Sequence, residues 1–298
     1  MTGIKKSSLF CIIVFVLLAC TCVSAPKHEE SQFSQWHYTF SVLLAPDKPT
    51  NSPRLDLGLT LLKMNYPDRQ GEYLSEALYL TDSFDVYKDR IIEEHRQRYR
   101  RMLPASARSA GREAAAYNWH YSERVNINRM YPDVAGARHS RARKSRKNQS
   151  QEIRGMVIER EINSYSGCGP ELKQKRYSVF DMDGLAQVRI DDLFIDYQGN
   201  TVLRDIVYEE LRKHSKLERT QALSKGFYFT DRPELSFNFF ITDEGLGLRW
   251  DPEQIAPYSV GAIEIILLWQ VIRPMMLDTG VELLAKFGIS FPYPYNEN

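Results

Sequence analysis

The segment RWDPEQIAPYSVGAIEIILLW, residues 249–269, determines how the second half of the chain can fold. Its apolar pattern is interrupted by a group of turn-forming residues, Pro257, Tyr258, Ser259 and Gly261. Proline cannot donate a hydrogen bond to a sheet, and glycine permits a sharp bend. We therefore expect the chain to leave one strand before Pro257 and to re-enter the sheet as AIEIILL, residues 262–268. No nucleophile, metal ligand or acid pair accompanies the turn, so it is not typical of a catalytic loop.

Two hairpins are expected on the N-terminal side of this segment. LSFNFFITDEGLGLRW, residues 235–250, predicts a hairpin around Asp243, Glu244 and Gly245, and Asp183-Gly184 predicts another within residues 177–194. Asp181, Asp183 and Asp191 suggest a calcium loop at first sight. Their spacing lacks the later ligands of an EF-hand, so turn formation is the better interpretation.

The rest of the chain mixes alternating and helical patterns. Strands are expected at 36–44, 55–66, 114–131 and 152–165, and helices at 83–103, 200–216 and 278–288. Asn200 and Asp278 are expected to cap the last two helices, and Gly288 to close the last one. Hairpins with inserted helices predict an α+β fold: a largely antiparallel sheet, two main inserted helices and a short C-terminal helix.

The N-terminus predicts export. MTGIKKSSLFCIIVFVLLAC has a basic start and an apolar run, residues 9–19, which is short for a membrane span and typical of a signal peptide. Leu17 to Cys20 resembles a lipobox, which would make residues 1–20 the signal and Cys20 the lipidated residue. Cleavage after Ala25 is the alternative. Residues 21–31 are expected to be a flexible tether. We expect a lipoprotein of the cell envelope, at the outer membrane or cell surface, that contacts the membrane through the lipid alone.

One local patch is strongly basic, although the net charge of the 298-residue chain is only +1. The predicted loop 132–151 carries these residues: Arg138, Arg141, Arg143, Lys144, Arg146 and Lys147. They are weak candidates for binding an anionic ligand. The alternative is a solvated polar loop, because no aromatic residues for base stacking are interleaved. Since an exported protein rarely meets nucleic acid, we expect no nucleic-acid partner.

The sequence contains no recognisable catalytic constellation. The nucleophile-elbow, metalloprotease, P-loop and dinucleotide-binding motifs are all missing. The histidines stand singly, and Cys168 has no partner at the spacing of a zinc site. Adjacent acids, such as Asp191-Asp192, point in different directions on a helix or strand. We assign no catalytic residue, metal ligand or cofactor. Whether the chain is an enzyme stays open, and a non-enzymatic protein is the favoured interpretation.

The order of these elements is similar to a known module. The residues that carry the resemblance are Phe180, Asp181, Gly184, Leu193, Phe194, Phe239, Gly245, Ile255, Ala256, Pro257, Tyr258 and Gly261. From about Met156 to the end, the chain resembles the extracytoplasmic domain of RsiV-like proteins. That module also precedes the catalytic domain of PdaC-type deacetylases and occurs in uncharacterised bacterial lipoproteins. The resemblance implies a smaller N-terminal strand-and-helix subdomain, 32–115, followed by the RsiV-like domain, 116–298.

The chain also departs from that pattern. No histidine occurs in SGCGPE, residues 166–171, and Asp251 to Gln254 stands where a Tyr-Glu pair is common. The signalling and deacetylase segments are not recognised, so the resemblance implies a non-enzymatic binding module. Peptidoglycan, another glycan or a protein such as a muramidase is the expected ligand, although the basic loop would repel a strongly basic lysozyme. A carbohydrate-modifying hydrolase with dispersed carboxylates and a structural or inhibitory subunit are the alternatives.

Overall fold

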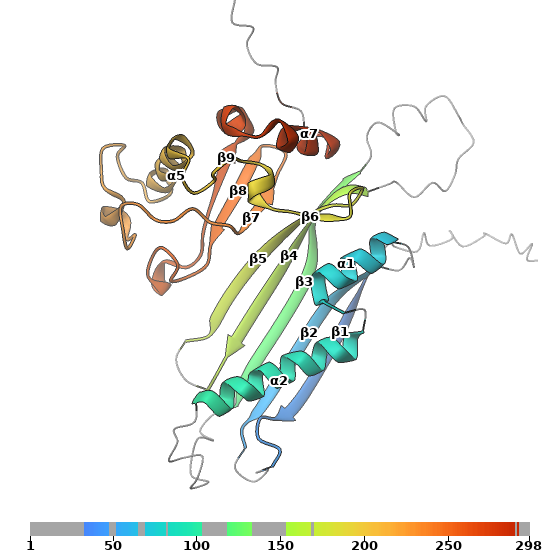
Figure 1. Cartoon of the computed structure of the whole chain (residues 1–298). Coiled ribbons are helices and arrows are strands. Elements are labelled where there is room, and N and C mark those ends of the chain that lie inside the picture. The colour runs from blue at the N-terminus through green and yellow to red at the C-terminus, as the bar shows by residue number, and fades with distance from the viewer. Residues whose placement is uncertain are drawn as a thin grey trace, which may run out of the picture. The chain divides into compact units, whose positions relative to one another are not determined.

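The computed structural model describes residues 33–47, 52–64, 69–81, 83–102, 118–132, 153–167, 170–289 and 291. These residues form two β-sheets with helices packed on them, which confirms the α+β class (Figure 1). Every described element lies within residues 32–298. Both hydrophobic cores therefore belong to this part of the chain.

The larger sheet has six strands in the order β1-β2-β3-β4-β5-β6. Their bounds are Phe33–Leu43, Arg54–Met64, Trp119–Pro132, Ile153–Tyr165, Leu172–Asp181 and Ala186–Val188. Strands β2 and β3 are parallel, and the other neighbours are antiparallel, as expected for a largely antiparallel sheet. The predicted division at 115/116 falls between β2 and β3, which pair within this one sheet, and it stays a prediction.

Two helices cover one face of this sheet. Helices α1 (Arg69–Tyr79) and α2 (Phe84–Met102) form the crossover that a parallel β2–β3 pair requires. Alternate leucines of β2, from Leu55 to Leu61, are buried against them. Helix α2 is predicted from the sequence, whereas α1 is not. The buried face of α1 carries few apolar residues, mainly Leu74 and Leu78, so its helical periodicity is weak.

The smaller sheet, β7-β8-β9, contains the segment that opened the sequence analysis. Strands β7 (Phe239–Ile241), β8 (Gly245–Trp250) and β9 (Ile263–Leu268) pair antiparallel. The predicted exit and re-entry around Pro257 are thereby confirmed, and Gly261 has the positive φ of 82° that the bend needs. Helices α5 (Thr201–His214), α6 (Trp269–Ile272) and α7 (Asp278–Lys286) complete this part.

The first half of strand β4, up to Ile158, is buried on both faces and joins the two cores. Met156 and Ile158 point into the core under α1 and α2, whereas Val157 belongs to the core of the smaller sheet. On β5, Phe180 and Val179 divide between the two cores in the same way. This follows from the period of two along a strand, and it makes the middle of the large sheet the common wall of both cores.

The structure confirms the predicted cap at Asn200, the aspartate turn and the closing glycine of the last helix. The Asn200 side chain accepts a hydrogen bond from Leu203 N (3.0 Å) and caps α5. Asp181 Oδ1 accepts bonds from the N–H groups of Asp183 (3.1 Å) and Gly184 (3.0 Å), so the aspartates form a turn. Gly288, with φ 79°, closes α7.

The predicted cap of α7 by Asp278 is wrong. Leu277 is the cap residue, and Asp278 is the first residue of the helix. The reason is tertiary: Leu277 N donates to Leu193 O (2.9 Å), next to the bridge between Phe194 and Met276. This pairing holds Leu277 in an extended conformation, so the helix begins directly after it.

A carboxylate is buried in the core between the large sheet and α2. Glu123 is 2% exposed and accepts hydrogen bonds from Tyr87 (2.6 and 2.8 Å) and Tyr121 (2.8 Å). Arg160 Nη1 lies 3.5 Å from the same carboxylate. Burial and the negative charge of Glu123 raise the pKa of Tyr87 and Tyr121, so both hydroxyls stay protonated and donate.

We predict that Glu123→Leu lowers the free energy of unfolding by about 3 kcal/mol, because it leaves two tyrosine hydroxyls without their acceptor and the partly buried Arg160 without its carboxylate. The matched control is Glu161→Leu, whose carboxylate pairs with Lys175 (3.1 Å) at a partly exposed position. That variant should lose about 1 kcal/mol or less. Chemical denaturation measures both values, and equal losses would contradict a special role for Glu123.

Candidate ligand-binding groove

A groove of about 740 Å³ lies where β5 meets the end of β8 and the irregular segment 227–238. Ser236, Asn238, Trp250 and Asp251 form its inner part. Its outer part contains exposed residues: Arg176, Phe229, Arg232, Glu234, Phe237 and Gln254. This groove therefore combines a polar floor with aromatic and charged groups at its opening.

Segment 227–238 has no regular secondary structure, yet side chains of neighbouring elements hold its backbone. Tyr197 donates to Ser236 O (2.7 Å), and Tyr208 donates to Pro233 O (3.1 Å). The Gln198 amide exchanges two hydrogen bonds with the backbone of Leu235 (2.7 and 3.2 Å). Because these bonds satisfy the loop from inside the molecule, its outer side chains are free to project into solvent.

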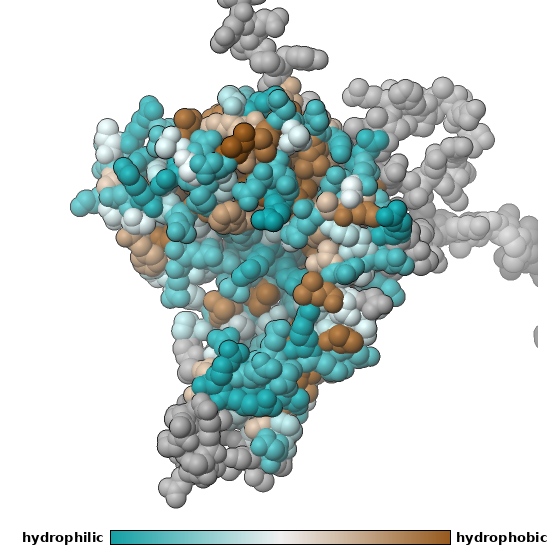
Figure 2. All heavy atoms as spheres, viewed as in Figure 1, coloured by the Kyte–Doolittle hydropathy of each residue, from teal (hydrophilic) through white to brown (hydrophobic). Residues whose placement is uncertain are grey.

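Three phenylalanines of this segment are exposed. Phe229 and Phe237 line the groove and are 59% and 61% exposed, and Phe227, outside the groove, is 70% exposed. Large aromatic side chains are usually buried. Figure 2 shows a predominantly hydrophilic face on which hydrophobic groups are small and separate. Two exposed aromatic rings at one groove form a local apolar surface that a ligand could contact.

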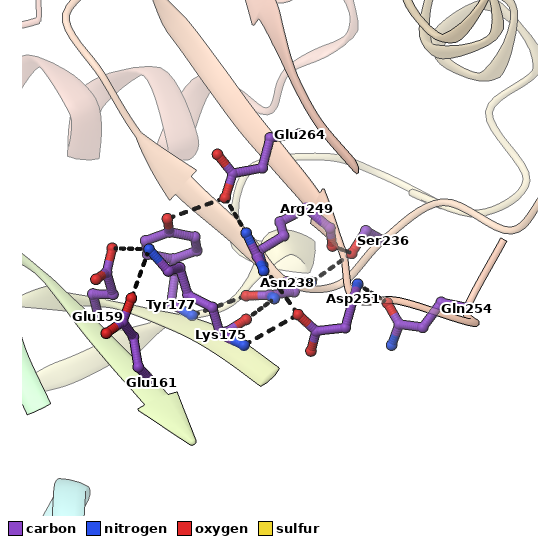
Figure 3. Close-up of polar contacts among 10 residues, drawn as sticks. All are labelled: Glu159, Glu161, Lys175, Tyr177, Ser236, Asn238, Arg249, Asp251, Gln254 and Glu264. Carbon is purple, nitrogen blue, oxygen red and sulfur yellow. Dashed lines mark hydrogen bonds and ion pairs between the residues drawn. The ribbon is translucent and has the colours of Figure 1, made fainter. Parts of the chain in front are cut away.

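The floor of the groove is built on the outer edge of β5 (Figure 3). The Asn238 amide donates to Lys175 O (2.7 Å) and accepts from Tyr177 N (2.8 Å). Asp251 Oδ1 accepts from Lys175 N (3.1 Å). These side chains replace the neighbouring strand that β5 lacks at this point, and they fix the loop and the β8 end against the large sheet.

Two cations beside the groove are shared among four carboxylates. Arg249 lies 3.0 Å from Asp251 and also binds Glu264, whereas Lys175 lies 3.2 Å from Glu159 and 3.1 Å from Glu161. Burial would lower the pKa of Arg249, but its bonds to Glu264 and Asp251 raise it above its ordinary value. Each of these carboxylates already has a cationic partner, which is the arrangement of structural ion pairs.

Tyr177 connects this ion-pair network to the smaller sheet. Its hydroxyl donates to Glu264 (3.3 Å), and its ring lies 4.5 Å from that of Phe240. Burial and the charge of Glu264 raise its pKa, so the hydroxyl remains a hydrogen-bond donor at neutral pH. Chemically, the groove offers aromatic faces, guanidinium donors and a polar floor. Among the described residues, no group of three His, Cys, Asp or Glu side chains could hold a metal ion.

The family-motif residues support the groove from beneath. Ile255 and Ala256 are buried, and Ile255 O accepts a hydrogen bond from Phe229 N (2.9 Å). The Tyr258 hydroxyl donates to Glu171 O (2.7 Å) at the start of β5. Ile255, one of the family-motif residues, therefore helps to position Phe229 at the groove.

The sequence analysis did not single out Phe229 or Phe237. Residues 235–250 were interpreted as one hairpin, but β7 begins only at Phe239, so Phe237 belongs to a loop. The alternating pattern of LSFNFF hid this boundary. The two adjacent clusters FYF and FNFF, separated by Pro233, are the signal that could have indicated an aromatic loop.

The other predicted site residues lie outside the described part of the chain. They are Cys20, the candidate lipidation site, and the six basic residues from Arg138 to Lys147. Cys168 also lies outside it. Within the part that the structure describes, none of the helices has the length and apolar character needed to cross a bilayer.

Comparisons with known proteins identify a family likeness. Residues 191–270 match the model of a family described as "Protein of unknown function (DUF3298)". A crystal structure of a DUF3298 family member from Bacteroides fragilis is similar at a TM-score of 0.63 and 16% identity, over 87% of this chain and 97% of that one. One from Pseudomonas aeruginosa is similar at 0.51 and 12%, over 83% and 95%. No curated protein matches the sequence.

The structural likeness shows a shared fold. The two sequence identities are too low to show a shared function. The matched residues 191–270 include α5, segment 227–238 and most of the smaller sheet, and thus much of the groove. The comparisons do not link the chain directly to RsiV-like proteins or to PdaC-type deacetylases, so that finer resemblance stays a prediction.

We predict that Asn238→Ala lowers the free energy of unfolding by about 2 kcal/mol, because it leaves the backbone groups of Lys175 and Tyr177 without partners. Asn126→Ala is the control, since its side-chain oxygen accepts one exposed hydrogen bond from Gln35 (2.7 Å). That change should cost about 0.5 kcal/mol or less. Denaturant titration distinguishes the two, and equal stability of both variants would show that Asn238 does not join the sheets.

Proposed function

We propose that this chain is an exported, lipid-anchored protein of the bacterial cell envelope that binds a glycan, peptidoglycan in particular, without chemical conversion. The observation that carries the proposal is the groove in which Phe229 and Phe237 stand exposed on a loop whose backbone is fixed. Such a surface is arranged before the ligand arrives, so little conformational entropy is lost on binding.

The chemistry of the groove suits a glycan. Sugar rings have apolar C–H faces, which exposed aromatic rings complement. They also have a rim of hydroxyl and amide groups. For this rim, the groove lining contains polar residues that include Gln254, Arg176 and Arg232. The combination of aromatic faces with a few polar groups is typical of small-molecule sites.

The two arginines of the lining suit a glycan that also carries carboxylates. The lining holds Arg176 and Arg232 and the acids Glu234 and Asp251, so it is formally neutral. Asp251 is buried and ion-paired with Arg249 at 3.0 Å, whereas both arginines of the lining are exposed. Peptidoglycan provides carboxylates on its stem peptides, and arginine is well suited to bind them through paired N–H donors.

The cellular location in this proposal is supported by the N-terminal sequence. Residues 1–20 have the basic start, the apolar run and the Leu-Leu-Ala-Cys end of a lipoprotein signal. A lipid-anchored protein in the envelope would meet peptidoglycan at high local concentration. Modest affinity at one groove would then be sufficient for a stable association.

We predict that Phe229→Ala and Phe237→Ala each weaken binding to insoluble peptidoglycan by about tenfold, as expected when a central aromatic contact is removed. Phe227→Ala is the matched control: it lies in the same segment and is 70% exposed, but it does not line the groove. Co-sedimentation with purified sacculi measures the affinities, and thermal unfolding verifies that all three variants remain folded.

The same assay decides between ligand classes. A muramidase such as lysozyme replaces the sacculi in a second series. If the wild-type chain binds the muramidase and not the sacculi, the glycan proposal is wrong and a protein ligand takes its place. If all three phenylalanine variants bind sacculi as the wild type does, the groove is not the binding site.

The anchor has a separate test. We predict that Cys20→Ala moves the protein from the membrane fraction to the soluble fraction and abolishes incorporation of labelled fatty acid, because no thiol remains at the end of the lipobox. Cys22→Ala, two residues later, should leave both unchanged. Membrane association of the Cys20→Ala protein at wild-type levels would exclude lipidation as the anchor.

A further inference from the structure

The floor of the groove contains a carboxylate with one oxygen that the fold does not use. Asp251 is 7% exposed, and its Oδ1 accepts hydrogen bonds from Lys175 N (3.1 Å) and Arg249 Nε (3.0 Å). Its Oδ2 has no hydrogen-bond partner among the residues that the structure describes, although buried polar atoms are normally bonded. Because Asp251 lines the groove, Oδ2 is an acceptor that a ligand can reach.

A hydrogen-bond donor lies next to this acceptor. Gln254 is exposed, and its Oε1 accepts a hydrogen bond from Asp251 N (2.7 Å). Since an N–H group needs an acceptor, the amide oxygen must face Asp251 N, and the amide nitrogen faces away from it. Within the described part of the chain, no group accepts a bond from this nitrogen. Figure 3 shows the nitrogen and the Asp251 carboxylate projecting to the same side of the turn at 251–254.

Both groups are fixed before a ligand binds, and an aromatic ring lies on the neighbouring segment. The bonds to Oδ1 hold the Asp251 carboxylate, and the bond from Gln254 N to Asp251 O (3.2 Å) closes the turn. Phe229 N donates to Ile255 O (2.9 Å), directly after Gln254 in the chain. A ligand that covers the exposed Phe229 ring therefore meets a preorganised acceptor and donor at the floor of the groove.

An acceptor and a donor that face the same side match two neighbouring hydroxyl groups of a sugar. One hydroxyl donates to Asp251 Oδ2, and the next accepts from Gln254 Nε2. The acetamido group of an amino sugar does not match, because a trans amide points its N–H and C=O in opposite directions. A carboxylate at this point is repelled by Asp251. A primary carboxamide offers both groups but has no apolar ring face to cover Phe229.

We propose that the groove binds a sugar ring through two neighbouring free hydroxyls, a proposal that rests on the glycan-binding function above. One hydroxyl is held by Asp251 and the other by Gln254, and the ring face lies on Phe229. In a 1,4-linked strand of N-acetylated sugars, the acetamido group and the linkage leave no such pair inside the strand. The pair remains only at the non-reducing end, on carbons 3 and 4. The groove therefore binds strand ends.

The probe that tests this is the methyl glycoside of the 1,4-linked N-acetylglucosamine tetramer, which has one pair of neighbouring free hydroxyls, at its non-reducing end. Periodate breaks the carbon–carbon bond between the two hydroxyls and is itself reduced to iodate, and borohydride then reduces the two aldehydes to alcohols. Calorimetry with the full chain should show that this cleavage weakens binding by about tenfold, because no ring holds the two hydroxyls side by side.

Gln254→Ala tests the donor. This variant should bind the intact tetramer about fivefold more weakly than the wild type does, and the cleaved tetramer equally well, because the donor has no fixed partner there. Gln221→Ala is the matched control. Gln221 is exposed, its Oε1 accepts a bond from Glu218 N (2.9 Å) in a similar turn, and it does not line the groove. This control should bind both tetramers as the wild type does.

Equal binding of the intact and the cleaved tetramer would overturn the proposal, and so would binding of sacculi without binding of the tetramer. The effects of Phe229→Ala and Phe237→Ala on sacculi would still support the glycan function in both cases. A Gln254→Ala variant that loses the same factor for both tetramers would show that Gln254 does not contact the hydroxyls. If neither the tetramer nor the sacculi bind, the glycan function itself is wrong. Thermal unfolding verifies that every variant is folded.

Discussion

The position of the smaller sheet against the larger one depends on the side chains that hydrogen-bond to the outer edge of β5. Between Leu172 and Ser178, no described strand pairs with the edge of β5 that faces away from β4, and backbone groups left unpaired away from water are costly. Side chains supply the partners: Asn238 for Lys175 and Tyr177, Asp251 for Lys175, and Tyr258 for Glu171. All three come from the connections of the smaller sheet. The interaction that completes one sheet therefore also positions the other.

The two ionic clusters have different surroundings and different roles. Glu123 lies in a closed core and is held by two tyrosine hydroxyls and Arg160. Arg249 lies at the junction and joins Asp251 to Glu264, so it ties the end of β8 to β9. Breaking a buried ion pair costs more than the pair contributes. We infer that each cluster selects one register or one packing, while the leucine-rich cores supply most of the stability.

The sequence predicts the strands and hairpins well because their signals are local. Alternation in β2 and β9 reflects one buried face, and Asn200, Gly288 and the Asp181 turn are fixed by neighbours in the chain. The misses have distant causes. Leu277 replaces Asp278 as a cap because of a bond to Leu193. The groove is absent from the sequence prediction because its loop is held by Tyr197, Gln198 and Tyr208, which no local pattern connects to Phe229 or Phe237.

The segment from Arg249 to Trp269 contains residues that serve the fold and residues that line the groove, and the two groups differ in how freely they can be substituted. Ile255, Ala256 and Tyr258 serve the fold: two are buried and the third caps the start of β5. Asp251 and Gln254 line the groove, and the Gln254 side chain accepts a hydrogen bond from Asp251 N (2.7 Å). Asp251 also serves the fold, because it accepts a hydrogen bond from Lys175 N and pairs with Arg249. Gln254 is exposed, so a change of residue type at this position can alter the groove while β8 and β9 keep their pairing. Ligand preference can therefore diverge within one fold.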